Sequence, residues 1–340
     1  MQIELPISKS IANRWLMLQA IHGDELMPVS DSMPDDVQIL HRALCLIALS
    51  PHRLMDVGNC GTAMRFLTAY CTQLEGQTTI LDGVERMRHR PIGQLVDALR
   101  EIGADIEYLG EEGFPPLRIK GCILDKHRIV TINNPLSTQF VSALLLIGAK
   151  VQTDSTSPYI YITQEVIKQY QLSPFSYHLS VEKDWSSAAF WYEYVALYGG
   201  EITLLGLSRD SLQGDKIVAD IFAHLGIHTT YTAEGAVISS SPLHPTPYTL
   251  HHDFVACPDL YPAVALTCER LGIELHATGV ESLPLKESDR LRAVREHRTD
   301  ADHRMAMALL IAGYEVDDTA CISKSYPNFI EHFRHINSLK

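Results

Sequence analysis

An internal repeat constrains the fold of this chain more than any other feature of its sequence. The heptapeptides Asp97 to Gly103 and Asp220 to Gly226 share one residue spacing, and each ends a helical pattern that is followed by a strand, a glycine-bearing turn and a second strand. Repetition of such a helix–strand–strand unit is typical of domains assembled from copies of one supersecondary motif. We therefore expect an α/β protein built from repeats and not one doubly wound sheet.

Apolar periodicity, turn residues and helix caps indicate the remaining elements. We expect a basic loop over 86–90 and a helix that opens with Cys257-Pro258-Asp259. No dinucleotide-binding or Walker glycine motif is found, so nucleotide-binding folds lack support. The expected helices cover residues 10–21, 35–49, 63–71, 91–102, 138–147, 185–198, 302–312 and 326–336, and the expected strands cover 2–5, 53–57, 78–81, 104–109, 117–120 and 158–163.

Composition excludes several functional classes. The 340 residues suffice for two domains, and a formal charge of −13 with a pI near 5.6 argues against nucleic-acid binding. The seven widely spaced cysteines contain no C-x-x-C pair and are interpreted as buried free thiols in a reducing compartment. The first residues lack a signal-peptide pattern, and no apolar run reaches membrane-spanning length, so we expect a cytoplasmic protein.

Compact cationic motifs stand out in this acidic chain. If Lys286 to Arg290 is helical, then Lys286, Glu287 and Arg290 project from nearly one face, which could hold an anion and move a proton. A solvated salt-bridge ladder is the alternative for this motif by itself. Four further clusters favour small anionic ligands: Lys9 with Arg14, Arg86 to Arg90, His303-Arg304, and Lys324.

Several polar motifs have structural explanations beside functional ones. The Gly58 to Thr62 turn exposes backbone N–H groups that suit an anion, although such a motif by itself is more often only a tight turn. Ser137-Thr138-Gln139 and Asp259 stand at helix starts, where capping is the ordinary role. His303 by itself is more often structural, and no metal-ligand spacing is present.

Taken together, these motifs resemble the 5-enolpyruvylshikimate-3-phosphate synthase family, the enolpyruvyl transferases of the shikimate pathway. The similarity extends in collinear order over nearly the whole chain, which makes it more specific than any single motif. The matching segments are Ser8 to Arg14, Gly58 to Arg65, Arg86 to Gly93, Ser137 to Phe140, Ser157 to Ile160, Gln213 to Asp215, Pro258-Asp259, Lys286 to Leu291, Asp302 to Met307 and Lys324 to Phe329.

The resemblance implies a fold of two domains, each made of three βαβαββ repeats, with the active site in the cleft between them. The division is expected at residues 9–182 for one domain and at 1–8 plus 183–340 for the other. Closure of the domains on shikimate 3-phosphate is expected to complete the phosphoenolpyruvate site. The resemblance further implies a cytoplasmic 3-phosphoshikimate 1-carboxyvinyltransferase of aromatic amino acid (chorismate) biosynthesis, expected to act as a monomer.

The resemblance also assigns substrate ligands, with no metal and no cofactor. Both substrates are polyanions, so several cations and N–H groups are needed to offset their mutual repulsion. The residues implied for shikimate 3-phosphate are Lys9, Ser10, Arg14, Ser137, Thr138, Gln139, Thr156, Tyr159, Asp259, Ser282 and Lys286. Those implied for phosphoenolpyruvate are Lys9, Asn59, Gly61, Thr62, Arg90, Gln139, Arg290, His303, Arg304 and Lys324.

In the implied reaction the 5-hydroxyl of shikimate 3-phosphate attacks C2 of phosphoenolpyruvate while the methylene carbon is protonated, and the tetrahedral intermediate then expels phosphate. Asp259 is expected to take the hydroxyl proton, with Lys9 as a second candidate, and Glu287 is expected to protonate the methylene carbon. Lys286 and Arg290 lie beside Glu287 in the sequence, and neighbouring cations favour the ionised carboxylate. Bound phosphate must counter that effect.

The chain departs from the family at several positions. Ile7, Cys60, Phe66, Thr156 and Ser282 stand where the family has glycine, alanine, proline, serine and asparagine. Phe66 puts sensitivity to the herbicide glyphosate in question, because it lies one turn below the Asn59 to Thr62 loop. Only eleven residues separate Arg290 from Asp302, fewer than in the family. Two rival functions follow: a UDP-N-acetylglucosamine enolpyruvyl transferase, and an anion-binding relative without catalysis.

Overall fold

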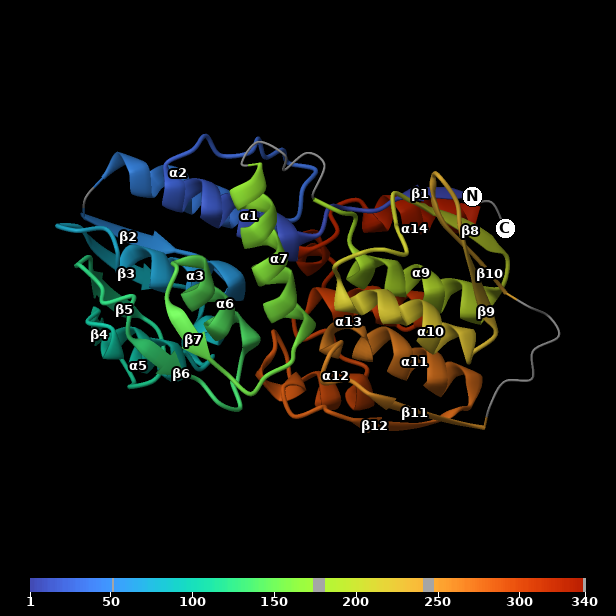
Figure 1. Ribbon diagram of the computed structural model, residues 1–340. Helices are drawn as coiled ribbons and strands as arrows, with labels where there is room; N and C mark the ends of the chain where they lie inside the picture. Colours follow the sequence, from blue (N-terminus) through green and yellow to red (C-terminus); the bar gives the residue numbers. More distant parts are fainter. Residues whose placement is uncertain (51, 174–180, 241–247, 339–340) are drawn as a thin grey trace. The chain divides into compact units, whose positions relative to one another are not determined.

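The computed structural model describes residues 1–50, 52–173, 181–240 and 248–338. These residues divide into two compact units (Figure 1). Unit 1 contains residues 1–9, 31–35 and 181–340, and unit 2 contains residues 10–30 and 36–180. Lys9, residues 31–35 and residues 181–182 therefore belong to unit 1, although the sequence-based division assigns them to the other domain. Each unit is a mixed α/β structure, as the sequence predicts.

Unit 2 holds a four-stranded sheet with the order β2-β3-β5-β4. Strand β2 pairs in parallel with β3, and β3, β5 and β4 pair antiparallel. Helix α3 connects the first two strands and α5 precedes the β4–β5 hairpin, which gives one complete βαβαββ repeat. The elements are β2 (His52–Asp56), α3 (Gly61–Cys71), β3 (Thr78–Asp82), α4 (Glu85–Arg88), α5 (Gly93–Glu101), β4 (Asp105–Tyr108) and β5 (Leu117–Lys120).

Unit 1 repeats this arrangement in its four-stranded sheet, which has the order β1-β8-β10-β9. Again the first two strands are parallel and the last pair forms an antiparallel hairpin. The sequence-based repeat is thereby confirmed, because α5-β4-β5 and α10-β9-β10 occupy equivalent places. The elements are β1 (Gln2–Glu4), α9 (Trp185–Tyr198), β8 (Glu201–Leu205), η1 (Gly214–Ile217), α10 (Val218–Ala223), β9 (Ile227–Tyr231) and β10 (Gly235–Ser240).

A second, shorter repeat follows in each unit. In unit 2 it is the parallel pair β6 and β7 around α6, followed by α7; in unit 1 it is the parallel pair β11 and β12 around α11. No terminal hairpin follows either pair in the described residues, so the expectation of three full repeats per domain is wrong for this part of the chain. The elements are β6 (Ile129–Thr131), α6 (Thr138–Leu146), β7 (Lys150–Gln152), α7 (Pro158–Leu172), β11 (Thr249–Asp253), η2 (Pro258–Leu260), α11 (Tyr261–Leu271) and β12 (Glu274–Thr278).

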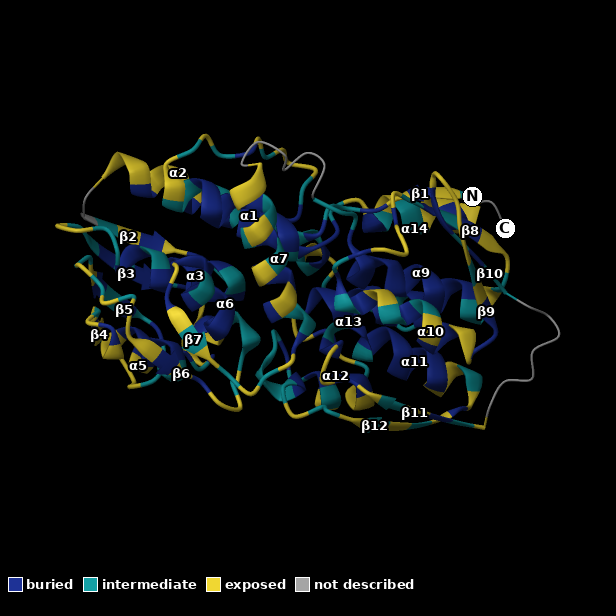
Figure 2. Ribbon diagram, viewed as in Figure 1, coloured by how far each residue is buried: buried dark blue, intermediate teal, exposed yellow. Residues whose placement is uncertain are grey.

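The remaining elements have no strand of their own. They are α1 (Lys9–His22) and α2 (Asp35–Leu49) near the N-terminus, and η3 (Leu283–Leu285), α12 (Arg290–Glu296), α13 (His303–Ala312), η4 (Ala320–Lys324) and α14 (Phe329–Ser338) in the last third of the chain. Within unit 1, α9, α11 and α13 pack on one another as a buried bundle (Figure 2). They are apolar around nearly their whole circumference, as expected for helices that are covered on all sides.

Four local expectations differ from the structure. Residues 158–163 form the start of helix α7, because Ser157 caps it and buried side chains recur at the helical spacing of Ile160, Thr163 and Val166. The β-branched residues in this segment also alternate with other residues, which led to the expectation of a strand. The basic segment 86–90 contains the short helix α4. Residues 286–289 are not helical, because Asp289 caps a new helix, α12, that starts at Arg290. Helix α5 also starts at Gly93, two residues after the expected Pro91.

All seven cysteines are free thiols, as expected, but Cys45 is exposed and Cys122 and Cys321 are partly exposed, so the expectation that all are buried is wrong. Within the described ranges, no helix is both long and apolar enough to pass through a membrane.

Candidate active site

The residues assigned from the resemblance fall into two groups, one in each unit. Nine belong to unit 1: Lys9, Asp259, Ser282, Lys286, Glu287, Arg290, His303, Arg304 and Lys324. Eleven belong to unit 2: Ser10, Arg14, Asn59, Gly61, Thr62, Arg90, Ser137, Thr138, Gln139, Thr156 and Tyr159.

Arg290 is the centre of the unit 1 group. Its side chain is only 1% exposed at the first position of α12, and its guanidinium contacts three carboxylates. Its Nε donates to Oδ2 of Asp302 at 2.8 Å, Nη1 to Oδ1 of Asp259 at 2.7 Å, and Nη2 to Oε2 of Glu287 at 3.2 Å. Burial opposes the charge, but these carboxylates outweigh burial and raise the pKa of Arg290 above its ordinary value.

Asp259 accepts hydrogen bonds from three cationic side chains. Besides Arg290, Nη2 of Arg304 donates to its Oδ2 at 2.8 Å, and Nζ of Lys286 donates to its Oδ1 at 3.4 Å. Burial favours the neutral acid, yet the charges of Arg304, Lys286, Arg290 and Lys9 prevail and hold the pKa of Asp259 well below its usual range. The N-cap role proposed as the structural alternative is not observed, because the 3-10 turn η2 begins at Pro258 and has no side-chain cap.

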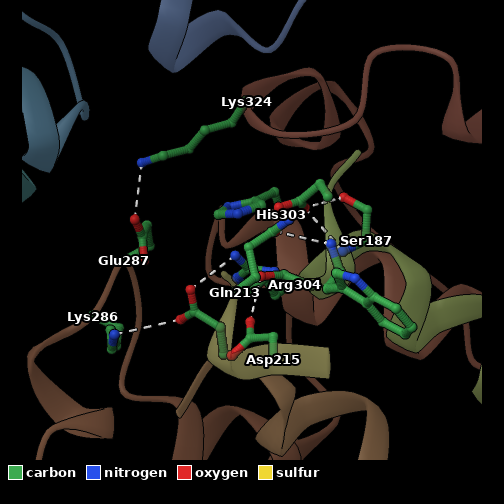
Figure 3. Close-up of polar contacts among 12 residues, drawn as sticks. Ser187, Gln213, Asp215, Lys286, Glu287, His303, Arg304 and Lys324 are labelled. Carbon is green, nitrogen blue, oxygen red and sulfur yellow. Dashed lines mark hydrogen bonds and ion pairs between the residues drawn. The ribbon is translucent and has the colours of Figure 1, made fainter. Parts of the chain in front are cut away.

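Glu287 lies between two cations. Its Oε2 accepts from Arg290, and its Oε1 lies 3.1 Å from Nζ of Lys324, with both side chains of this second pair 10% exposed (Figure 3). Lys286 points instead toward Asp259, and burial lowers its pKa. The three residues of the Lys286 to Arg290 motif thus meet as a cluster although the segment before Arg290 is not a helix. The salt-bridge ladder on a solvated surface is excluded by their burial.

His303 and Arg304 are brought to the cluster by the N-terminus of α13. Asp302 caps this helix through the backbone N–H of Arg304 at 2.9 Å and also accepts from Ser288 Oγ at 3.1 Å. His303 is 1% exposed, and neither ring nitrogen has a hydrogen-bond partner among the described residues. Burial, together with Lys9 and Arg304, lowers the pKa of His303 well below its ordinary value. The imidazole is therefore neutral and can accept or donate a hydrogen bond.

The sequence reasoning missed three acidic contributors to this site. Asp302 supports both Arg290 and α13, and Asp184 caps α9 through Ser187. Asp215 is hydrogen-bonded to Ser186, and burial followed by the proximity of Asp259 raises its pKa to about 7. The sequence contains an indication of two of them. Asp302 is the first residue of one segment that matches the family, and Asp215 is the last residue of another, Gln213 to Asp215, to which no role was assigned. Asp215 and Asp259 form a carboxyl pair whose pKa values are driven apart, an arrangement typical of catalytic sites.

In unit 2, the start of α3 gathers two guanidinium groups. Cys60 caps the helix, and Gly61 occupies its first position. A Cβ atom on Gly61 would lie 2.3 Å from Nη1 of Arg65 and 2.7 Å from Nη1 of Arg90, so a larger residue there would displace both guanidinium groups. Arg65 and Arg90 are 3% and 8% exposed. The helix N-terminus and two cations together suit an anionic group; Arg65 was part of a matched motif but was not assigned to the site.

The start of α6 lies beside this group. Ser137 caps α6, as the sequence predicts, and Nε2 of Gln139 donates to Oγ1 of Thr62 at 2.9 Å. Thr156 borders a separate cavity of about 610 Å³ between α7 and β6–β7, which is lined largely by hydroxyl and amide side chains with Lys150. Asn59 and Thr138 are partly exposed. The structure thus brings Gly61, Thr62, Arg90 and Gln139 together.

Arg14 crosses from α1 to the same region of unit 2 and is 2% exposed. Its guanidinium donates to Thr163 Oγ1 at 2.7 Å, the carbonyl of Ser10 at 2.6 Å, the carbonyl of Tyr159 at 3.0 Å and Ser142 Oγ at 3.1 Å. Burial lowers its pKa to about 10. None of these partners is a carboxylate, so the buried positive charge is not neutralised by them.

Among residues 1–50, 52–173, 181–240 and 248–338, no three His, Cys, Asp or Glu side chains are arranged so that they could hold a metal ion.

Comparison with known proteins gives one consistent result. The sequence model of EPSP synthase (3-phosphoshikimate 1-carboxyvinyltransferase) matches residues 37–298 and 295–333. A 3-phosphoshikimate 1-carboxyvinyltransferase from Bacteroides fragilis is 36% identical over 98% of this chain and 94% of its own length. One from Cellvibrio japonicus is 30% identical over 99% of this chain and 96% of its own. EPSP synthase from Acinetobacter baumannii, a solved structure, superposes with a TM-score of 0.67 at 20% identity, covering 97% of this chain and 94% of that one.

These alignments also locate a difference. They extend over 393 and 418 positions, more than the 340 residues of this chain, so the relatives contain internal segments that it lacks. The two family matches meet at residues 295–298, at the C-terminal end of α12. The short connection between Arg290 and Asp302 is therefore one place where the chain is abbreviated.

Proposed function

The chain belongs to the EPSP synthase family, whose members transfer the enolpyruvyl group of phosphoenolpyruvate to shikimate 3-phosphate, and we propose the following roles for its residues in that reaction. The observation that carries the proposal is the buried charge cluster of unit 1. There Arg290, Arg304 and Lys324 are held by the protein's own carboxylates on Asp259 and Glu287. Cations paired in this way are preorganised for an anionic ligand.

We propose that phosphoenolpyruvate exchanges with these carboxylates. Its phosphate and carboxylate would take hydrogen bonds from Arg290, Arg304 and Lys324, each charge-assisted bond being worth roughly 1.5–3 kcal/mol. The exchange has a chemical consequence: Asp259 and Glu287 lose cationic partners, so their pKa values rise toward those of useful proton-transfer groups. The neutral imidazole of His303 offers a further hydrogen bond.

The unit 2 group completes the proposed ligand set. Gly61, Thr62, Asn59 and Arg90 would contact phosphoenolpyruvate at the start of α3, with Arg65 as an addition to that group. Ser10, Arg14, Ser137, Thr138, Gln139, Thr156 and Tyr159 would contact shikimate 3-phosphate, together with Lys9, Ser282, Lys286 and Asp259 of unit 1. Gln139 would serve both substrates, because it already bonds Thr62.

The proposed chemistry proceeds by addition and elimination. Asp259 removes the proton of the 5-hydroxyl, with Lys9 as the alternative base, and the oxygen attacks C2 of phosphoenolpyruvate. Glu287 donates a proton to the methylene carbon, which becomes a methyl group. In the second step that methyl group returns a proton, the C–O bond to phosphate breaks, and the enolpyruvyl double bond forms again. Lys324 and Arg290 hold Glu287 in place before the substrate arrives.

The test is phosphate release by the purified full chain supplied with shikimate 3-phosphate and phosphoenolpyruvate. Release that depends on both substrates is the expected result. The matched control replaces shikimate 3-phosphate with UDP-N-acetylglucosamine, and turnover of the sugar nucleotide alone would favour the rival transferase. Tight binding of both substrates without phosphate release would favour the rival without catalysis. A cytoplasmic location and a monomeric state remain part of the proposal, and gel filtration of the active enzyme tests the second.

A further inference from the structure

Phe66 is a residue for which the family resemblance supplies no role, because proline is usual at its position. It lies on α3, four residues after Thr62, and is 1% exposed. The carbon at the centre of the Arg14 guanidinium lies 5.5 Å from the centre of the Phe66 ring, on its face. This distance is within the range of a cation–π interaction.

The contacts of Arg14 divide into two kinds. Four hydrogen bonds, to Ser10, Ser142, Tyr159 and Thr163, orient the guanidinium within its own plane. Phe66 covers one face of that plane. A guanidinium has five N–H groups, and the bonds to described residues occupy four of them, so one N–H on Nη1 is available for a ligand. The four hydrogen bonds and the Phe66 ring together determine the direction in which that N–H group points.

The Phe66 ring matters because Arg14 carries a buried positive charge. No carboxylate is among the described partners of this buried cation, so its neighbours are hydroxyls, carbonyls and one aromatic face. The attraction between a cation and a ring is stronger when both are removed from water. Phe66 therefore interacts with the charge of Arg14 without competing with an anionic ligand for its N–H groups.

We propose that Phe66 is a positioning residue that holds Arg14 for the carboxylate or phosphate of shikimate 3-phosphate. It acts through Arg14 and does not touch the substrate. The inference rests on the proposed role of Arg14 as a ligand of this substrate. Since Phe66 shares α3 with Gly61 and Thr62, it also joins the Arg14 network to the helix that carries part of the proposed phosphoenolpyruvate group.

The experiment replaces Phe66 with phenylalanines bearing one, two and three ring fluorines. Fluorination weakens the negative face of the ring while nearly preserving its shape, so packing is retained while the cation–π attraction declines. The KM for shikimate 3-phosphate should rise progressively, by roughly 3- to 30-fold across the series, as expected for the loss of a partly desolvated cation–π contact. The kcat and the KM for phosphoenolpyruvate should change less than twofold.

Two controls separate this role from simple packing. The same fluorinated series at Phe222, which is fully buried in unit 1 beside Tyr192, should leave every kinetic constant unchanged. In an Arg14→Ala background, Phe66→Leu should add no further rise in the KM for shikimate 3-phosphate. An unchanged KM across the Phe66 series, or equal increases for both substrates, would overturn the proposal. Failure of the unmodified chain to release phosphate would instead contradict the proposed function, and the two outcomes are thus distinguishable.

Discussion

The substitution Glu287→Gln tests the proposed proton donor most directly. Glutamine retains the length of glutamate and can still accept one hydrogen bond, from Arg290 or from Lys324, but it cannot supply a proton to the methylene carbon. A positioned general acid contributes about 10²–10⁴-fold to rate, so we expect kcat to fall by that factor. This corresponds to a barrier increase of about 3–5 kcal/mol.

The same substitution has a smaller structural effect that can be estimated from the contacts. Glu287 loses its charge opposite Arg290 and Lys324, at 3.2 and 3.1 Å, but Arg290 keeps Asp259 and Asp302. One weakened charge-assisted contact in a nearly buried site should lower the free energy of unfolding by about 1–2 kcal/mol. In a chain with units of this size, that change lowers the melting temperature by about 2–8 °C.

Steady-state kinetics with both substrates at saturation, together with a thermal melt, measure both effects. Glu269→Gln is the matched control, because Glu269 also accepts from two partners, His297 and Tyr314, but has no proposed substrate contact. It should lose stability without losing kcat. A Glu287→Gln enzyme with kcat within a few-fold of the unsubstituted value would refute the acid assignment and leave Lys9 or Asp259 as candidates. A rise in KM with kcat unchanged would reduce Glu287 to the ion-pair partner of Arg290.

Three further predictions concern the site and its support. Neutralising Arg90, Arg304 or Lys324 should raise the KM for phosphoenolpyruvate at least tenfold, several times more than that for shikimate 3-phosphate, and equal losses would mean that the subsites are wrongly divided. Glu193 is fully buried, its two oxygens have no hydrogen-bond partner among the described residues, and burial raises its pKa well above the ordinary value. The folded state keeps the proton that the unfolded state loses above about pH 4.5, so the free energy of unfolding declines as pH rises. In denaturant titrations, Glu193→Leu should therefore stabilise the protein more at pH 8 than at pH 5. An equal gain at both pH values would count against a buried neutral acid. Ala301 has a φ of 56° in the short connection before α13. Ala301→Gly should therefore raise the free energy of unfolding by about 1 kcal/mol, whereas the control Ala312→Gly within α13 should lower it by about as much. A loss of stability in both variants would show that the left-handed position is not strained.

The sequence by itself determined many of the elements and indicated the chemical class of the ligands. Caps and periodicity located α6 at Ser137 and α13 at Asp302, because a helix start depends on a few adjacent residues. The heptapeptide repeat predicted the equivalence of the two four-stranded sheets, since each copy carries its own turn and hairpin. The cationic motifs predicted anionic ligands, because charge is a property of composition. The same local reasoning failed where two periods overlap, at residues 158–163, and where a cap interrupts a motif, at Asp289.

Only the tertiary structure decided which charges meet. Asp259, Glu287 and Asp302 lie on three different segments, and their convergence on Arg290 depends on how η2, α12 and α13 pack. In this cluster the pKa of Asp259 is held well below its usual range, and the pKa of Asp215 is raised to about 7. Both shifts arise from burial and from distances to other charges, which cannot be read from residue spacing in the sequence. The same is true of Phe66, whose ring reaches Arg14 from a position 52 residues later in the sequence. The sequence shows which chemical groups lie near one another along the chain. The pKa values of these groups and their hydrogen-bond and ion-pair partners depend on packing that brings distant residues together.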